Sequence, residues 1–265
     1  MAHPTYTTIA VRDHVAYVTI NRPESRNPLG PFVSYELSQH WDRIEADDDI
    51  WIGVITGAGD QAFCAGNDLK FRARVLTAAE SAEVEDLTAR TRGLHVRWHF
   101  PKPMIARVNG FAMGGGLELA LACDIVVAAD HAEIGLPEPR RGLIAGAGGV
   151  HRLPRQIPQK VAMGYMLTGR HMPIARAYEL GLVNQVVPLA QLDAAVGEWV
   201  RDIKRCAPLS IRATKEAAMK GLDAPTLAAA FNADYEWELR RRQSQDAKEG
   251  PLAFAEKREP VWQGK

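Results

Sequence analysis

Apolar and polar positions alternate near the start of the chain, and the spacing then becomes helical. The alternation runs through residues 7–23, on both sides of Arg12-Asp13-His14, and predicts a β-hairpin. Residues 31–46 instead carry apolar side chains at helical spacing, which predicts a helix that buries one side: Phe32, Leu37, Trp41 and Ile44. The apolar run IWIGVITG, residues 50–57, then predicts a buried strand.

Strands and helices continue to alternate through the middle of the chain. The small residues of GAGDQAFCAGNDLK, residues 57–70, predict a loop, and a long and mostly polar helical region follows. Further short apolar runs predict strands at 102–110, 124–130 and 132–138. A glycine-led stretch predicts a helix after the first of these strands, and residues 146–158 return to a helix after the last.

Helical patterns dominate from Pro158 onward. They are interrupted by four prolines, at positions 173, 188, 208 and 225, and the one strand predicted in this part is VNQVV, residues 183–187. The chain is therefore predicted to be an α/β protein, with an α/β portion at residues 1–187 and an all-helical region at residues 188–265.

Composition changes this picture little. Lysine plus arginine equals aspartate plus glutamate, 32 each, so the balance gives no reason to expect nucleic acid or a membrane as a partner. The N-terminal residues show no signal-peptide pattern, and Glu118, Asp124 and Asp130 interrupt the most apolar stretches, which argues against a membrane span. Three widely spaced cysteines form no zinc pattern and are expected to be reduced, buried thiols of a cytoplasmic protein: Cys64, Cys123 and Cys206.

The stretch MGGGLELALACD, residues 113–124, places one carboxylate in apolar surroundings just after a helix start. The first N–H groups of a helix have no partner within it and carry partial positive charge. Gly115 allows a ligand carbonyl to approach such a donor, and Glu118 lies three residues later on the same helix face. The leucines and alanines around Glu118 argue against a solvated position. The stretch therefore predicts an oxyanion donor beside an acid/base group.

A second donor and a second carboxylate are available elsewhere. The segment FCAGNDLK, residues 63–70, has an unobstructed backbone around Gly66, and Glu138 lies between two prolines near the end of a predicted strand. A glutamate in such a loop is common by itself, so Glu138 is a candidate catalytic residue only as a partner of Glu118. Two carboxyl groups near one carbonyl can hold a water molecule and move protons at adjacent carbons. That set of groups suits the addition of water to a double bond conjugated with a carbonyl.

Three segments in order resemble the enoyl-CoA hydratase/isomerase family, also called the crotonase family: FCAGNDLK, ARVNGFAMGGGLELALACDIVVAAD and GLPEPRRGLIAGAGGVHRLPR. The resemblance extends from VTINRPESRNPL to EGPLAFAEKREPVW, nearly the whole chain. It implies a crotonase-like spiral of ββα units, with the C-terminal helical region packing in trimers that often pair into hexamers. It also implies a coenzyme A thioester as substrate, with no metal and no further cofactor.

The resemblance further implies roles for individual residues. The amides of Asn67 and Gly115 would bind the thioester carbonyl, the counterpart of Glu118 helps to activate water, and that of Glu138 delivers the proton to the α-carbon. Residues expected to bind coenzyme A are Arg22, Arg26, Ala65, Asp68, Leu69 and Lys70, together with Phe254 and Lys257, which would contact the coenzyme A of a neighbouring subunit. Asn67 departs from the alanine or glycine that the family more often has, which affects the expected substrate rather than the chemistry.

The leading hypothesis is an enoyl-CoA hydratase, which adds water to a 2-enoyl-CoA and gives a 3-hydroxyacyl-CoA. The alternatives are an enoyl-CoA isomerase, a dehydratase of a specialised acyl-CoA such as carnitinyl-CoA, and a non-catalytic relative that binds acyl-CoA or RNA. The other glycine runs lack the Gly-Lys-Ser/Thr of a phosphate loop. His95 and His99 are four residues apart, a spacing that can bind metal on a helix, but without a third ligand they are interpreted as a partly exposed helical surface.

Overall fold

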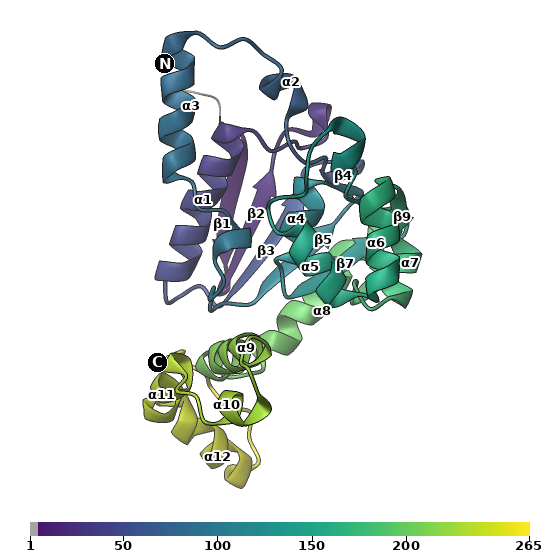
Figure 1. The fold of residues 1–265 in the computed structure, drawn as a ribbon. Coiled ribbons are helices and arrows are strands. Elements are labelled where there is room, and N and C mark those ends of the chain that lie inside the picture. The colour runs from purple at the N-terminus through teal and green to yellow at the C-terminus, as the bar shows by residue number, and fades with distance from the viewer. Residues whose placement is uncertain (1–4) are drawn as a thin grey trace.

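The first of two sheets contains the predicted N-terminal hairpin. The computed structural model describes residues 5–265, and in them six strands follow the order β1 (Thr7–Arg12), β2 (Val15–Ile20), β3 (Ile52–Gly57), β5 (Met104–Val108), β7 (Ile125–Ala129) and β10 (Gln185–Val187) (Figure 1). The hairpin β1–β2 is antiparallel, and the remaining neighbours are parallel. Asp13 and His14 both have positive φ, as a two-residue type I′ turn requires.

The second sheet has the order β4 (Ala62–Cys64), β6 (Phe111–Met113), β8 (Glu133–Gly135) and β9 (His171–Pro173). Each successive pair, β3 with β4, β5 with β6 and β7 with β8, contributes one strand to each sheet, so the chain advances as a spiral. The prediction of a loop over residues 57–70 was incomplete, because this stretch contains β4 and a short helix. The sequence analysis also missed β6 and β9. These strands are three residues long, like β8 and β10, but they do not stand out as separate apolar runs as those two do.

Helices connect the strands and cover the sheets. The predicted helix at 31–46 is α1, and its buried side includes Leu37, Trp41 and Ile44, whereas Phe32 is only half-buried. The other elements before residue 188 are η1 (Pro23–Ser25), α2 (Leu69–Arg72), α3 (Ala78–Arg90), η2 (Leu94–Val96), α4 (Gly115–Leu121), η3 (Glu138–Arg141), α5 (Gly149–Gln156), α6 (Gln159–Thr168) and α7 (Ile174–Glu179).

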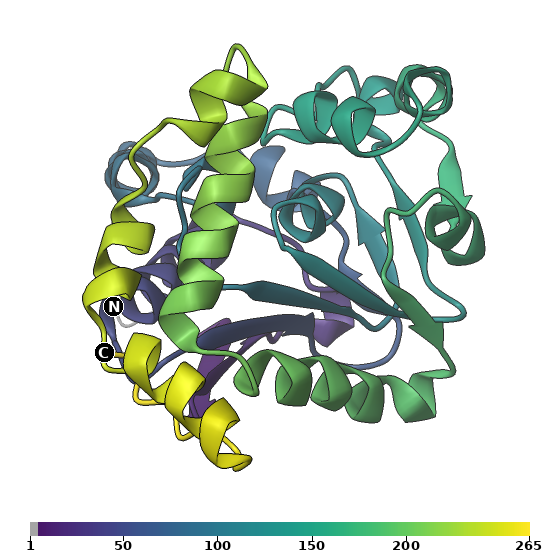
Figure 2. The ribbon, with the colours of Figure 1, turned by 90° about the horizontal axis from the view of Figure 1, so that it is seen from below.

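The C-terminal region is helical, as predicted. It contains η4 (Leu189–Gln191), α8 (Leu192–Lys204), α9 (Pro208–Leu222), α10 (Leu227–Phe231), α11 (Glu236–Gln243) and α12 (Asp246–Glu256). Helix α8 lies across one side of the first sheet, where its apolar face joins a cluster with strand residues such as Ile52 and Val127 (Figure 2). Helix α8, which follows the predicted domain boundary between residues 187 and 188, thus shares a core with the strands that precede it. The boundary itself stays a prediction.

The first sheet is buried on both faces, which explains the continuous apolar runs in its strands. Along β3, Ile55 joins the larger cluster with α1 and the second sheet, while Ile52 and Val54 join the cluster under α8. Along β5, Met104 and Ala106 belong to the larger cluster and Ile105 to the other. Neighbouring residues of a strand point to opposite faces of the sheet, so they alternate between the two clusters. This alternation fixes the register in which the turns of the spiral stack.

Two smaller expectations were wrong. Cys64 is buried, but Cys123 is only partly buried and Cys206 is exposed, so the three free thiols do not share one environment. His95 lies in the short element η2 and His99 lies outside any helix, so the pair does not form a helical surface. In residues 5–265 no cluster of histidine, cysteine and acidic residues could hold a metal ion, and none of the helices there is long and apolar enough to cross a membrane.

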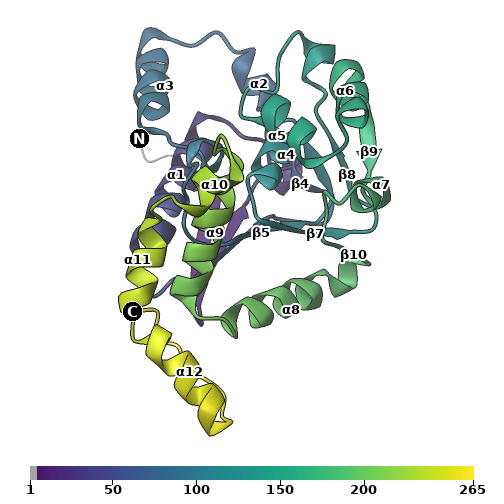
Figure 3. The same ribbon diagram turned by 60° about the horizontal axis from the view of Figure 1, so that its bottom comes forward.

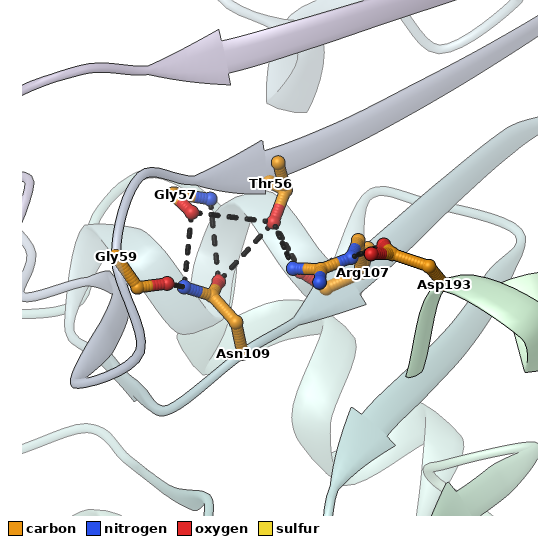
Figure 4. A network of polar contacts seen from close by, with 6 residues as sticks. All are labelled: Thr56, Gly57, Gly59, Arg107, Asn109 and Asp193. Carbon is orange, nitrogen blue, oxygen red and sulfur yellow. Dashed lines mark hydrogen bonds and ion pairs between the residues drawn. The ribbon is translucent and has the colours of Figure 1, made fainter. Parts of the chain in front are cut away.

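Buried Asn109 connects the end of β3 to the start of the second sheet. Its Nδ2 donates to the carbonyls of Gly57 (2.9 Å) and Gly59 (2.7 Å), and its Oδ1 accepts from the Gly57 amide at 3.3 Å (Figure 4). In the same network Arg107 donates from Nε to Asp193 at 2.6 Å, but the Asp193 side chain is 85% exposed. Asn109 thus fixes the loop that leads into β4, whereas Asp193 only extends the network into solvent.

The Asn109→Ala variant is expected to lower the free energy of unfolding by about 2–4 kcal/mol, because it leaves several buried backbone groups without partners. The Asp193→Ala variant is the control from the same network, and it is expected to cost under about 1 kcal/mol because its ion pair is exposed. Urea unfolding followed by circular dichroism measures both values. Equal losses would contradict the role given to Asn109.

Candidate active site

A pocket of about 700 Å³ lies between the segment after β4 and the start of α4. Its lining includes six of the residues singled out from the sequence: Ala65, Asn67, Leu69, Gly115, Glu118 and Glu138. The remaining lining residues are Arg72, Gly114, Pro137, Arg141, Gly142, Leu143, Ile144, Gly146 and Ala147. Segments far apart in the chain therefore meet at this one pocket, referred to below as the main pocket.

The segment Gly66–Asp68 presents the Asn67 amide to the main pocket. Leu29 pairs with this segment: its N–H donates to the Gly66 carbonyl at 2.7 Å, and its carbonyl accepts from Asp68 N–H at 2.8 Å. Amides alternate in direction along an extended strand, so the N–H of Asn67 faces away from Leu29. Within residues 5–265 it makes no hydrogen bond. It is a free donor beside the pocket.

Gly115 supplies a second free donor at the same place. It is the first residue of α4, so its N–H has no partner within the helix. The two donors are close, because a Cβ added to Gly115 would lie 3.9 Å from the Asn67 nitrogen. The approach depends on Gly66, which has φ of +86° and whose added Cβ would lie 2.5 Å from the Met113 carbonyl. Two free amides this close together are the arrangement that binding of an oxyanion requires.

Glu118 is the buried carboxyl group on α4, with 4% of its surface exposed. Its Oε1 accepts a hydrogen bond from the Gly149 amide at the start of α5, at 2.8 Å. Burial raises its pKa above the ordinary glutamate value, and the negative charge of Glu138 adds to the rise, while the amides of Gly149 and Ala147 and the charge of Arg152 oppose it. The sequence placed Glu118 on the same helix face as Gly115; in the structure the start of a second helix, α5, holds its carboxyl group.

Glu138 is the first residue of η3 and reaches over the start of α4. A Cβ added to Gly114 would lie 2.9 Å from Glu138 Oε1, so the absence of a side chain at Gly114 makes room for the carboxyl group. Its Oε2 is buried and finds no hydrogen-bond partner among the described residues. Burial raises the pKa of Glu138. Two neighbouring carboxyl groups with raised pKa values can divide into one acid and one base.

The sequence analysis missed Arg152, which lies behind Glu118. Its guanidinium stacks on the Trp98 ring at 4.8 Å from the centroid, and its Nη2 donates to the His95 carbonyl at 2.8 Å. Its charge favours the ionised form of Glu118. Because 34 positions separate the two residues along the chain, only the packing of α5 against α4 brings them together.

The residues expected to bind coenzyme A do not all lie in one place. Arg22 and Asp68 form an ion pair at 2.9 Å and line a separate cavity of about 280 Å³ beside the main pocket. Lys70 is exposed on α2. Arg26 stacks on the Phe111 ring at 5.6 Å from its centroid and lines neither cavity. Asp68 and Lys70 nevertheless lie on a segment that borders the main pocket, and Arg26 contacts it, because its carbonyl accepts from the Ala65 amide at 3.0 Å.

Phe254 and Lys257 lie elsewhere in the chain. Phe254 is 87% exposed on α12, and Lys257 caps the end of that helix. Helix α12 lies at the opposite end of the molecule from α2 and α4 (Figures 1 and 3). Within a single chain the structure therefore does not bring these two residues to the main pocket.

The spiral of paired strands and the glycine-led helix start define a protein of the crotonase class, and comparison with known proteins identifies the family. The family model for enoyl-CoA hydratase/isomerase matches residues 11–265, and the chain belongs to this family.

The chain is 40% identical to (E)-benzylidenesuccinyl-CoA hydratase of Thauera aromatica over 97% of its length and 98% of that protein. It is 37% identical to carnitinyl-CoA dehydratase of Escherichia coli K12 over 94% of each chain. The crystal structure of an enoyl-CoA hydratase from Bacillus anthracis superposes with a TM-score of 0.88 at 34% identity, over 98% of this chain and all of that one.

The Gly66→Ala variant is expected to be less stable than wild type by several kcal/mol, because a positive φ costs about 1–2 kcal/mol for alanine and the clash with the Met113 carbonyl adds to it. The Gly181→Ala variant is the matched control, since Gly181 also has positive φ but an added Cβ would meet no atom within 4 Å. Thermal unfolding compares the two. If both variants lose the same stability, the close approach of Gly66 to the Met113 carbonyl does not explain why glycine is required at position 66.

Proposed function

We propose that the protein hydrates a 2-enoyl-CoA to a 3-hydroxyacyl-CoA. The observation that carries the proposal is the juxtaposition of two free amides, at Asn67 and Gly115, with two carboxyl groups of raised pKa, Glu118 and Glu138. The family membership and the names of the relatives, which include hydratases and a dehydratase of CoA thioesters, support the same class of reaction.

The two amides would bind the thioester carbonyl oxygen. Donation from Asn67 and Gly115 polarises the conjugated double bond and makes its β-carbon electrophilic. When a nucleophile adds there, negative charge moves to the carbonyl oxygen, where two fixed donors and the start of α4 stabilise it. Because the donors are already oriented by β4 and α4, they need no reorganisation during the reaction.

The two glutamates would move the protons. Glu118, held by the Gly149 amide, accepts a proton from water as the hydroxyl oxygen bonds to the β-carbon. Glu138, in its protonated form, gives a proton to the α-carbon as the enolate collapses to the thioester. The double bond is lost, and one water molecule has been added; the proton that Glu118 took up returns to Glu138 before the next turnover. Because ionisation of one group disfavours ionisation of the other, the pair is expected to hold one proton between its two members, as this sequence of steps requires.

Coenzyme A would enter beside α2. We assign Ala65 and Leu69 to the arm that leads from the thioester, and Arg22, Arg26, Asp68 and Lys70 to the nucleotide end. Phe254 and Lys257 would act on the coenzyme A of a neighbouring subunit, in a homotrimer or a pair of trimers, with the helical residues 188–265 making the contacts between subunits. Their distance from the main pocket in one chain is consistent with this assignment.

Purified protein mixed with crotonyl-CoA tests the proposal. Loss of the conjugated thioester absorbance and a product heavier by one water molecule are expected. Product of unchanged mass with a shifted double bond would identify an isomerase instead. The reverse reaction on 3-hydroxybutyryl-CoA is expected at the same active site, since a catalyst accelerates both directions. If no enoyl-CoA in a series of chain lengths changes mass, the hydratase proposal is wrong.

The Glu118→Gln and Glu138→Gln variants are each expected to lower kcat by about 10²–10⁴-fold with a small change in KM, because proton transfer is lost while size is kept. In Glu118→Gln the amide oxygen can still accept from Gly149. The Glu133→Gln variant is the control, because Glu133 pairs only with His171 at the surface. Steady-state kinetics with crotonyl-CoA measure the three variants, and near-wild-type turnover in either active-site variant would remove that residue from the mechanism.

The pH profile of kcat/KM is expected to be bell-shaped, with its acid limb above the ordinary glutamate value of about 4.5, because burial raises both pKa values. Activity falls as pH drops through the lower apparent pKa, where the base is protonated, and falls again above the higher one, where the acid is ionised. Arg152→Met is expected to move the acid limb to higher pH, because the lost charge favoured ionised Glu118. Arg155→Met, an exposed position on the same helix, is expected to leave the profile in place.

A further inference from the structure

Two arginines line the main pocket in addition to the two glutamates. Arg72 is the last residue of α2 and Arg141 the last residue of η3, so they reach the pocket from two separate elements. No acidic side chain of the described residues pairs with either one: Arg141 donates only to the carbonyl of Arg140, at 3.2 Å, and Arg72 makes no side-chain hydrogen bond. Two unpaired cations at a pocket attract an anion.

The rest of the lining is mostly apolar on the side of these arginines. Leu69, Pro137, Leu143 and Ile144 border the same pocket, and Ile144 is 71% exposed although it is a large aliphatic residue. Asn67 adds an uncharged amide side chain near the two donors. An apolar wall with two arginines suits a ligand that has an apolar body and a negatively charged group.

We infer that the acyl group of the substrate carries a carboxylate, which Arg72 and Arg141 bind across the main pocket from the oxyanion donors. The inference rests on the proposed hydratase function, because it places the thioester at Asn67 and Gly115. An arginine guanidinium matches the planar geometry of a carboxylate and forms two parallel hydrogen bonds to it. The same two charges repel an acyl group that carries an ammonium group.

The phosphates of coenzyme A are the other anions in this substrate. They lie at the far end of the pantetheine arm from the thioester, whereas Arg72 and Arg141 line the pocket that also holds Glu118 and Glu138. Lys70, exposed on α2, and Arg22, which pairs with Asp68, are the cations available to the phosphates next to this pocket. A carboxylate on the acyl group is therefore the anion that fits the position of Arg72 and Arg141.

The test compares four enoyl-CoAs. One is trans-2-hexenoyl-CoA; one replaces its terminal methyl by a carboxylate; one has a carboxymethyl branch at the β-carbon; and one ends in a trimethylammonium group. At least one carboxylated thioester is expected to have a kcat/KM about tenfold or more above the neutral one, since a hydrogen bond to a charged group is worth about 1.5–3 kcal/mol. The trimethylammonium thioester is expected to be the poorest substrate.

The Arg72→Met/Arg141→Met double variant is expected to abolish this preference while it leaves hydration of trans-2-hexenoyl-CoA near the wild-type rate. Arg72→Lys keeps the charge and is expected to retain part of the preference. Arg155→Met is the matched control, an exposed arginine that does not line the pocket. Thermal unfolding and binding of free coenzyme A verify that each variant is folded.

Three outcomes overturn the inference while the hydratase function stands. The neutral thioester is hydrated at least as fast as both carboxylated ones; or the double variant slows all thioesters equally, which assigns the arginines to the phosphates; or the trimethylammonium thioester is preferred. If no thioester is hydrated by a folded protein, the proposed function itself fails.

Discussion

The close approach of two backbone segments controls the rest of this structure. The strand β4 and the segment after it lie directly against the turn between β6 and α4, with no side chain between them. A Cβ on Gly116 would lie only 2.1 Å from the Cys64 carbonyl, and one on Gly66 would lie 2.5 Å from the Met113 carbonyl. Side chains at these two positions would separate the segments, and the amides of Asn67 and Gly115 would no longer face one pocket.

The fold also has to keep two carboxyl groups in a partly buried site. Removing a carboxylate from water is costly unless hydrogen bonds or charges replace the water. For Glu118 the start of α5 supplies an amide at 2.8 Å, and Arg152 supplies positive charge from behind. Glu138 has no such support at its Oε2 among the described residues. The two carboxyl groups therefore differ in environment, and the negative charge of Glu138 raises the pKa of Glu118. The pair tends to hold one proton between its two members, which the proposed reaction requires.

The main pocket holds two sets of groups with different proposed tasks. In the proposed reaction the amides and glutamates act on the thioester and its neighbouring carbons, and every substrate with a conjugated thioester presents those atoms alike. Arg72, Arg141 and the Asn67 side chain lie on the same pocket but on elements α2, η3 and the segment after β4. In the inferred binding mode they would meet the part of the acyl group that differs between substrates, and they would then determine which thioester is accepted.

Much of this protein follows from the sequence itself. The two-residue repeat at 7–20, the helical spacing at 31–46 and the apolar runs at β3, β5 and β7 were sufficient to predict these elements, because each pattern is local and long enough to be periodic. The motifs around Gly66, Gly115 and Glu118 also identified the family, which the full-length match confirms. The three-residue strands β4, β6 and β9 were missed because they do not stand out as separate apolar runs, as the equally short β8 and β10 do.

The tertiary structure decided what depends on distant partners. Three features of the site join residues at least 20 positions apart. Gly149 and Arg152 support Glu118, the absence of a side chain at Gly114 makes room for Glu138, and Arg72 and Arg141 line the same pocket. The sequence determined which groups carry the chemistry, because a side chain's identity is fixed by its own position. Only the stacking of the spiral determined their distances, burial and charge, because those properties belong to pairs of residues that the chain does not place side by side.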